Sequence, residues 1–318
     1  MMLARVADAL YWIGRYLERA ENVARLVLVT SEISVEIEGL DDDVSQAEWD
    51  SLAVAVPGAQ NIPRDFSPAT GLALPYLEAL LLDEANPVSV RCSLARAREN
   101  ARGVREALTR EVFLTLNEAW RDLERLAREP LASPGEGFQA LTRVHGDILA
   151  VLGAMEHTLS RDAGWTFLKL GEALERTRRT ALVLRAKLPQ LGGVARTDLP
   201  LVYARWRSLL RSVASLENFR REHGARLDPQ QVVRFLLFDR HAPRSIFCGM
   251  ARMKNYLAQL PQRRNGDGAA RIVGRLLARI EFDDAQILEK PDLTPFLDEV
   301  VARLADADAA IAREFFFT

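Results

Sequence analysis

Two stretches of the sequence, separated by about half its length, repeat one pattern. IGRYLERAEN (13–22) and LGEALERTRR (170–179) share Gly-x-x-Leu-Glu-Arg at an offset of 157 residues. The same offset places WDSL (49–52) on WRSL (206–209). At an offset of 156, LLLDEANPVSV (80–90) falls on LLFDRHAPRSI (236–246), and Cys92 falls on Cys248. Three blocks that keep their order and spacing predict an ancestral duplication of the chain.

The pattern of apolar residues is helical. Leu and other apolar residues recur every three or four positions over 3–28, which is typical of one long amphipathic helix. No stretch alternates with period two, so we expect an all-α fold, a helical bundle whose two duplicated halves pack about a pseudo-twofold axis. The first copy covers about 3–129, a joining helix about 136–161, the second copy about 165–282 and a terminal helix about 293–315. Pro134-Gly135 and 191–193 predict breaks between helices, and the Pro-rich stretch 57–71 predicts a long loop.

Composition excludes several classes of function. The net charge is −2, and acidic residues are interspersed among the basic ones, which argues against a nucleic-acid partner. No run of about 18 apolar residues could span a membrane, and the N-terminus lacks the pattern of a signal peptide, so we expect a cytoplasmic protein with reduced Cys92 and Cys248. Arginines make up 38 of the 42 basic residues. A genome-wide preference for arginine explains this bias, as would guanidinium groups that hold carboxylates or phosphates.

Five ordered blocks resemble the bacterial alpha-E domain family, and the resemblance covers nearly the whole chain. They are RVADALYWIGRYLERAENVARLV, NPVSV, ARENAR (97–102), TLSRDAGWTFLKLGEALERT and DRHAPRSI. The resemblance implies an all-helical fold and partnership with an ATP-grasp-type protein, with a transglutaminase-like peptidase as a further partner. It also implies that the glutamates of the family are Glu18 and Glu175. The sequence departs from the family pattern at Glu172, where an arginine is common, and at Arg178, where an acidic residue is usual.

The repeated glutamates carry the hypotheses about a functional site. Gly14, Glu18, Glu21 and Arg25 fall in one wedge of the first helix, about 90° from the centre of its apolar stripe, which places the carboxylates at the edge of the core. Gly14 and Gly171, one turn before each glutamate, would let another backbone approach closely. A carboxylate at the core's edge needs a basic partner. The candidate partners and substrate-binding residues are Arg19, Arg25, Glu99, Asn100, Arg102, Arg176, Arg244 and Ser245, with Glu18, Glu21 and Glu175.

Three interpretations of this set stay open. Glu18 and Glu175 could be buried ion-pair anchors that fix the two halves together. They could instead line a cleft between the copies, holding a substrate amine while arginines hold a carboxylate or phosphate. The one-turn spacing of Glu18 and Glu21, and of Glu172 and Glu175, would also suit metal ligands, although the Glu-x-x-His companion of di-iron bundles is absent. We expect no bound metal.

The two proline motifs and the chain end have simpler interpretations. In NPVSV and APRSI we expect the proline to open a helix that Asn86 or a nearby Asp caps, with anion binding at Ser89 and Ser245 as the alternative. The three phenylalanines 315–317 fit a docked terminus better than a partner-binding segment. The sequence contains no Gly-x-Ser-x-Gly elbow and no phosphate-binding Gly-rich loop, so we expect no cofactor on this chain.

The function expected from these patterns is an accessory role. The chain would present or select an amine-bearing substrate for an ATP-grasp-type ligase that makes or modifies a peptide-like amide. A helical enzyme with Glu18 or Glu175 as general base is one alternative, and a purely structural scaffold is the other. Whether the chain is an enzyme stays open.

Overall fold

The structure is a computed structural model that describes residues 2–37, 42–56, 58–59, 76–128, 133–191, 199–261, 268–282 and 284–316. Within these ranges every regular element is a helix and no strand occurs, so the all-α prediction is confirmed. Most of the predicted loop 57–71, and the predicted break after Leu191, lie outside the described residues. None of the described helices has a stretch long and apolar enough to cross a membrane.

The chain divides into two compact units. Unit 1 comprises Met1–Asp42 and Val56–Glu172, and unit 2 comprises Asp43–Ala55 and Ala173–Thr318. The division falls within one continuous helix, α7 (Ala163–Leu191). It also assigns α2 (Asp42–Ala55), which belongs to the first sequence copy, to the unit that holds most of the second copy. Copies in the sequence and compact units in the structure are therefore different divisions of the chain.

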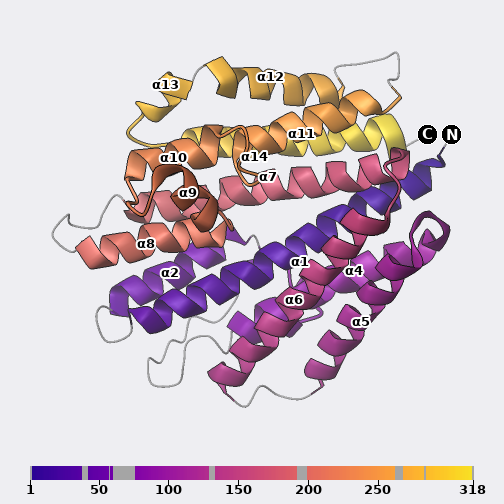
Figure 1. Ribbon diagram of the computed structural model, residues 1–318, viewed down its shortest axis with the longest axis horizontal. Helices are drawn as coiled ribbons and strands as arrows, with labels where there is room; N and C mark the ends of the chain where they lie inside the picture. The colour runs from indigo at the N-terminus through magenta and orange to yellow at the C-terminus, as the bar shows by residue number, and fades with distance from the viewer. Residues whose placement is uncertain are drawn as a thin grey trace. The chain divides into compact units, whose positions relative to one another are not determined.

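Unit 1 is built around the long helix α1 (Ala4–Glu36), which packs against α4 (Val90–Gly103) and α6 (Pro134–Thr158), as Figure 1 shows. The helix α5 (Arg110–Leu126) packs against α4 and α6. The unit also contains the π-helix η3 (Glu78–Leu82), the 3-10 helix η4 (Arg105–Ala107) and the start of α7 up to Glu172. Ser133 caps α6 and Pro134 begins it, so Pro134-Gly135 opens the predicted joining helix.

Unit 2 contains the rest of α7 and the helices of the C-terminal half of the chain. Helix α12 (Ala269–Phe282) packs against α11 (Ile246–Gln259) and against α14 (Thr294–Ile311). Glu314, at the end of the unit, accepts a hydrogen bond of 2.9 Å from the N–H of Ala269, the first residue of α12. This bond joins Glu314 to α12; docking of the three phenylalanines stays a prediction, and Phe317 lies outside the described residues. The remaining elements of the unit are α8 (Leu199–Ser212), α9 (Leu216–His223), α10 (Pro229–Phe238), α13 (Asp284–Leu288) and the π-helix η5 (Ala312–Phe316).

The edge-of-core position expected for the α1 carboxylates is wrong. Glu18 is 0% exposed and Glu21 is 2% exposed, and Arg25 is buried with them. The reason is that α1 has neighbours on more than one side, since α4 and α6 both pack on it. A helix covered on several faces buries its polar wedge together with its apolar stripe.

Candidate functional site

Two glycines set the position of the repeated motif. A Cβ atom added to Gly14 of α1 would lie 2.1 Å from the carbonyl oxygen of Leu168, and one added to Gly171 of α7 would lie 2.1 Å from that of Tyr11. Leu168 is 157 residues from Tyr11, as Gly171 is from Gly14, so the repeat offset exchanges the two contacts. The predicted close approach of a backbone at both glycines is confirmed. This contact fixes the helical turns that lead into Glu18 and Glu175.

In unit 1 the motif supports a buried ion pair. Arg25 donates a hydrogen bond to Glu21 Oε1 one turn away, and both side chains are at most 7% exposed. His145 of α6 places its Nε2 atom 3.2 Å from the same carboxylate oxygen. The His145 side chain is 21% exposed and is the most accessible member of this group. One carboxylate oxygen is thus held by basic groups of two helices, which links α1 to α6.

In unit 2 the corresponding helix carries a second buried ion pair. Arg179 donates from Nε (3.1 Å) and from Nη2 (3.0 Å) to Glu175 Oε1, and Glu175 has no exposed side-chain surface. Breaking such a pair by removing one partner is costly, about 3–5 kcal/mol, because a charge stays buried. Glu175 therefore has the geometry of an ion-pair anchor within its unit. Glu18 belongs to unit 1 and Glu175 to unit 2, and their convergence on one cleft stays a prediction.

The other predicted site residues belong to both units. Glu99 and Arg102 form an ion pair of 3.5 Å on α4, where both side chains are more than half exposed, and Asn100 is half-buried beside them. Arg19 is half-buried, with its guanidinium carbon 5.5 Å from the centre of the Tyr16 ring. Arg176 and Arg244 are also half-buried, and the carbonyl oxygen of Arg244 accepts a hydrogen bond of 3.0 Å from Thr180. A substrate-binding role for these residues stays a prediction.

The proline motifs form two turns with the same hydrogen bonds, and our assignment of their caps is wrong. Ser89 is the N-cap of α4 and Ser245 is the N-cap of α11, each accepting from the backbone N–H of the cysteine three residues later at 3.0 Å. Each hydroxyl also donates to the carbonyl oxygen of an aspartate six residues earlier, Asp83 or Asp239. Pro87 and Pro243 lie in the turn before the cap and do not open the helix. Because both hydroxyls are buried and already donate their protons to these carbonyl oxygens, neither can also donate to an anion.

The sequence analysis missed a buried charged cluster in unit 2. Glu48 of α2 accepts from Lys187 of α7, from Arg205 Nε of α8 at 3.3 Å and from the Ser208 hydroxyl at 3.4 Å. Burial raises the pKa of the Glu48 carboxyl, but the charges and hydrogen bonds of Lys187 and Arg205 outweigh burial and leave this pKa below its ordinary value. The four side chains are at most 5% exposed, so the cluster anchors α2 within unit 2.

A signal for this cluster was present in the repeat. The offset of 157 places Arg205 on Glu48 and Ser208 on Ser51, around the shared Trp and Ser-Leu of WDSL and WRSL. Opposite charges at equivalent positions of two copies suit a contact between those copies. Among the described residues, no group of three His, Cys, Asp or Glu side chains has an arrangement that could hold a metal ion, the Glu18 and Glu21 pair included.

The fold and the site together describe an all-helical protein that buries Glu–Arg ion pairs inside its helical units. A family model described as "a predicted alpha-helical domain with a conserved ER motif" matches residues 2–316, so the chain belongs to the Alpha-E family. Glu-Arg occurs in this chain at 18–19, 124–125 and 175–176.

The curated relatives are longer proteins of mycobacteria. An uncharacterized protein of Mycobacterium bovis is 26% identical over 323 residues, which are 96% of this chain and 35% of the relative. An uncharacterized protein of Mycobacterium tuberculosis is 25% identical over the same shares of both chains. The chain thus spans about a third of the length of the curated relatives it matches. No solved structure matches the chain.

Proposed function

We propose that this chain is a non-catalytic accessory module that acts with an ATP-grasp-type ligase. It would select or present the amine-bearing substrate while the ligase activates the acid and forms or modifies a peptide-like amide. A transglutaminase-like peptidase is proposed as a further partner, and the cytoplasm as the setting, where ATP is available to the ligase. We expect no nucleic-acid partner and no cofactor held by this chain.

The observation that carries this proposal is the state of the repeated glutamates. A general base must reach the proton it removes, at a heavy-atom distance of about 2.6–3.2 Å or through one water. Glu18 and Glu175 have no exposed surface, and Glu175 is held by Arg179. This burial disfavours a catalytic role and leaves binding or support. The length of the relatives is consistent with a module that works beside other domains.

A structural scaffold is the second candidate, and the same buried pairs favour it. Both candidates keep Glu21–Arg25 and Glu175–Arg179 as anchors of the fold, and they differ only in whether the chain contacts substrate. An accessory module changes the rate or the substrate choice of the ligase. A scaffold holds the ligase in place without changing either.

The experiment combines copurification with a ligation assay. An ATP-grasp-type protein, the proposed partner, is purified with and without this chain, and ATP turnover and amide formation are measured over a panel of amines. We expect a stable complex whose preference among amines depends on this chain. An unchanged preference in a stable complex would support the scaffold, and failure of the two proteins to associate would contradict both candidates.

Variants of the two glutamates test catalysis directly. Glu18→Gln and Glu175→Gln are compared with Glu118→Gln, which changes an exposed glutamate of α5. Circular dichroism first establishes that each variant is folded. A folded Glu175→Gln protein that still supports ligation agrees with the accessory role, whereas loss of chemistry at unchanged complex formation would favour the general-base alternative.

A further inference from the structure

Unit 1 contains a small cavity that is separate from the buried Glu–Arg pairs. Its volume is about 240 Å³, and it lies between the start of α1, the connection from η4 to α5 and the connection from α6 to α7. We call it the α6–α7 cavity. Pockets for drug-sized ligands span about 300–1,000 Å³, so this one suits a ligand of amino-acid size. Its lining comprises Leu10, Glu106, Ala107, Leu108, Thr109, Leu159, Ser160, Asp162, Gly164, Trp165 and Leu168.

The wall of the cavity is apolar on one side. Leu10 and Leu168 are almost completely buried, and Trp165 also lines the cavity. Gly164 keeps the space open, because a Cβ at this position would lie 3.1 Å from Leu10 Cδ1 and 3.2 Å from Asp162 Oδ1. This side offers contact to the hydrocarbon body of a ligand.

The polar side of the cavity carries negative charge alone. Glu106 and Asp162 contribute two carboxylates, and the lining contains no Lys, Arg or His. Asp162 uses Oδ1 to cap α7, accepting from the N–H of Trp165 at 3.0 Å. No ion pair joins Glu106 to another residue in the part of the chain that the structure describes. The hydroxyls of Thr109 and Ser160 are the uncharged polar side chains of the lining.

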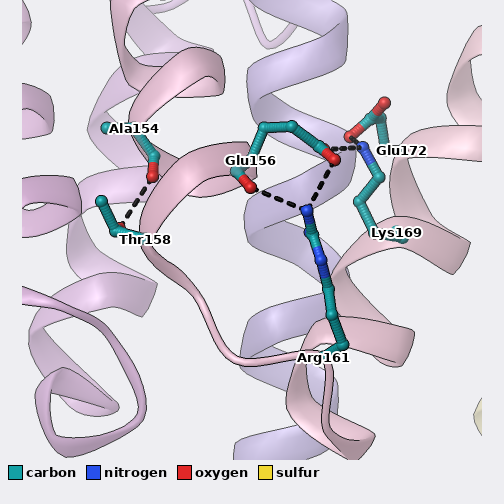
Figure 2. A network of polar contacts seen from close by, with 6 residues as sticks. All are labelled: Ala154, Glu156, Thr158, Arg161, Lys169 and Glu172. Atoms are coloured by element: carbon teal, nitrogen blue, oxygen red, sulfur yellow. Dashed lines mark hydrogen bonds and ion pairs between the residues drawn. The ribbon is translucent and has the colours of Figure 1, made fainter.

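Two of the cations that adjoin the lining in sequence, Arg161 and Lys169, pair with glutamates, as Figure 2 shows. Arg161 donates to the Glu156 carbonyl oxygen at 2.8 Å and to Glu156 Oε1 at 2.9 Å. Lys169 lies 2.5 Å from Glu172 Oε2 and 3.4 Å from Glu156 Oε2. Neither basic residue lines the cavity, but the Arg161 guanidinium carbon lies 3.7 Å and Lys169 Nζ 5.1 Å from the centre of the Trp165 ring, which does. The lining itself therefore offers two carboxylate acceptors and no basic group.

We propose that the α6–α7 cavity binds a small primary ammonium ligand with a short hydrocarbon side chain. The ammonium group donates to Glu106 and Asp162, and the hydrocarbon part contacts Leu10, Leu168 and Trp165. Carboxylate acceptors select the charged amine over a neutral amide of the same shape, because a neutral amide gives no charge-assisted hydrogen bond. This inference goes beyond the proposed function, because it concerns a binding site of unit 1 and requires no ligase.

The test measures binding of L-leucinamide to the full chain by isothermal titration calorimetry, with N-acetyl-L-leucinamide as the uncharged control. We expect saturable binding of L-leucinamide and at least about tenfold weaker binding of the acetylated compound, the difference typical of one hydrogen bond to a charged group. Glu106→Gln should weaken binding of L-leucinamide about tenfold without a change in stability, since this side chain is exposed and forms no ion pair with a described residue.

A second variant and a control separate binding from folding. Asp162→Asn keeps an N-cap side chain on α7 but removes the charge, and should also weaken binding about tenfold. Glu118→Gln on the exposed face of α5 should change nothing. Absence of saturable binding, equal binding of the two compounds, or unchanged binding to the Glu106→Gln, Asp162→Asn double variant would each overturn the inference. Association with the ligase is measured separately, so failure of either proposal is recognised independently of the other.

Discussion

Gly14 occupies a helix interior, where alanine is normally the more stable residue by about 1 kcal/mol. At this position alanine should instead be the less stable residue, because its Cβ would lie 2.1 Å from the backbone oxygen of Leu168, which cannot move without displacing α7. We expect Gly14→Ala to lower the free energy of unfolding by about 2–3 kcal/mol, in the range of other overpacked sites. Urea denaturation followed by circular dichroism measures this change.

A matched control for Gly14 exists in the same unit. Gly146 of α6 is exposed, and a Cβ added there meets no atom within 4 Å. Gly146→Ala should therefore raise the free energy of unfolding by about 0.5–1 kcal/mol. If both substitutions stabilise the protein, the close approach at Gly14 is not maintained in solution.

Glu48 makes the stability of the folded protein depend on pH in the acid range. A carboxyl whose pKa is lower in the folded than in the unfolded chain adds stability above its unfolded pKa, and this stability is lost as the pH falls through the folded pKa. For Glu48 the loss begins near the ordinary glutamate pKa of 4.5 and continues below it. Asp8 and Asp147 act with the opposite sign, since burial raises the pKa of each. The stability that these two carboxyls contribute is lost as the pH rises from 3.8 through their raised pKa values.

The Glu48→Gln variant removes the contribution of the Glu48 carboxylate and so measures it. It should lower the free energy of unfolding by about 3–5 kcal/mol at neutral pH, because Lys187 and Arg205 are left buried without their carboxylate. It should also show a smaller loss of stability than the parent when the pH is lowered below 4.5. Urea titrations at a series of pH values test both effects, and parallel pH curves for the two proteins would contradict the assignment.

At the scale of elements, α4 and α11 begin with the same serine N-cap, Ser89 in one and Ser245 in the other. Replacing an N-cap serine by alanine costs about 0.5–2 kcal/mol. Ser245→Ala should fall at or above the top of this range, because the buried hydroxyl also donates to the Asp239 carbonyl oxygen. Ser133→Ala, at the exposed start of α6, removes one bond of 3.2 Å and should cost about 1 kcal/mol or less. Equal losses for Ser245→Ala and Ser133→Ala would show that the second bond contributes nothing.

The elements also show how far the sequence alone leads. The three- to four-residue period predicted the helices that became α1, α6 and α14, because helix formation there follows local patterning. The caps of α4 and α11 were assigned to the wrong residues, since Asn, Asp and Ser compete as caps within one turn and only the folded turn decides. The Glu48 cluster joins residues that are 139 and 157 apart, and no local pattern encodes such pairing. The charge reversal between EWDSL and RWRSL was the available signal.

The burial of Glu18 and Glu21 escaped prediction for a related reason. A helical wheel places a residue relative to its own helix, but exposure depends on how many neighbours the helix receives. The wheel placed the carboxylates beside the apolar stripe, and α4 and α6 then cover more than that stripe. The motif was found from sequence, whereas its sealed environment required the fold.

At the scale of the whole molecule, neither half of the chain contains a complete compact unit. Unit 2 needs α2, whose Glu48 is bound by Lys187 and Arg205, and unit 1 needs the start of α7, whose Gly171 meets the Tyr11 carbonyl oxygen. A cut after Ser160, in the connection between α6 and α7, separates each unit from one of its own helices. The fragments 1–160 and 161–318 should therefore unfold without a cooperative transition when each is studied alone.

Mixing the two fragments should restore most of the helical signal and a cooperative transition, because the missing contacts of both units are then available in trans. Thermal unfolding followed by circular dichroism on each fragment and on the mixture measures this, with the intact chain as the reference. Glu48→Gln in fragment 1–160 should weaken reassembly, since it removes the carboxylate that Lys187 and Arg205 bind. A fragment 161–318 that melts alone at the temperature of the intact chain would mean that unit 2 does not depend on α2. The placement of α2 in unit 2 would then contribute nothing to the stability of that unit.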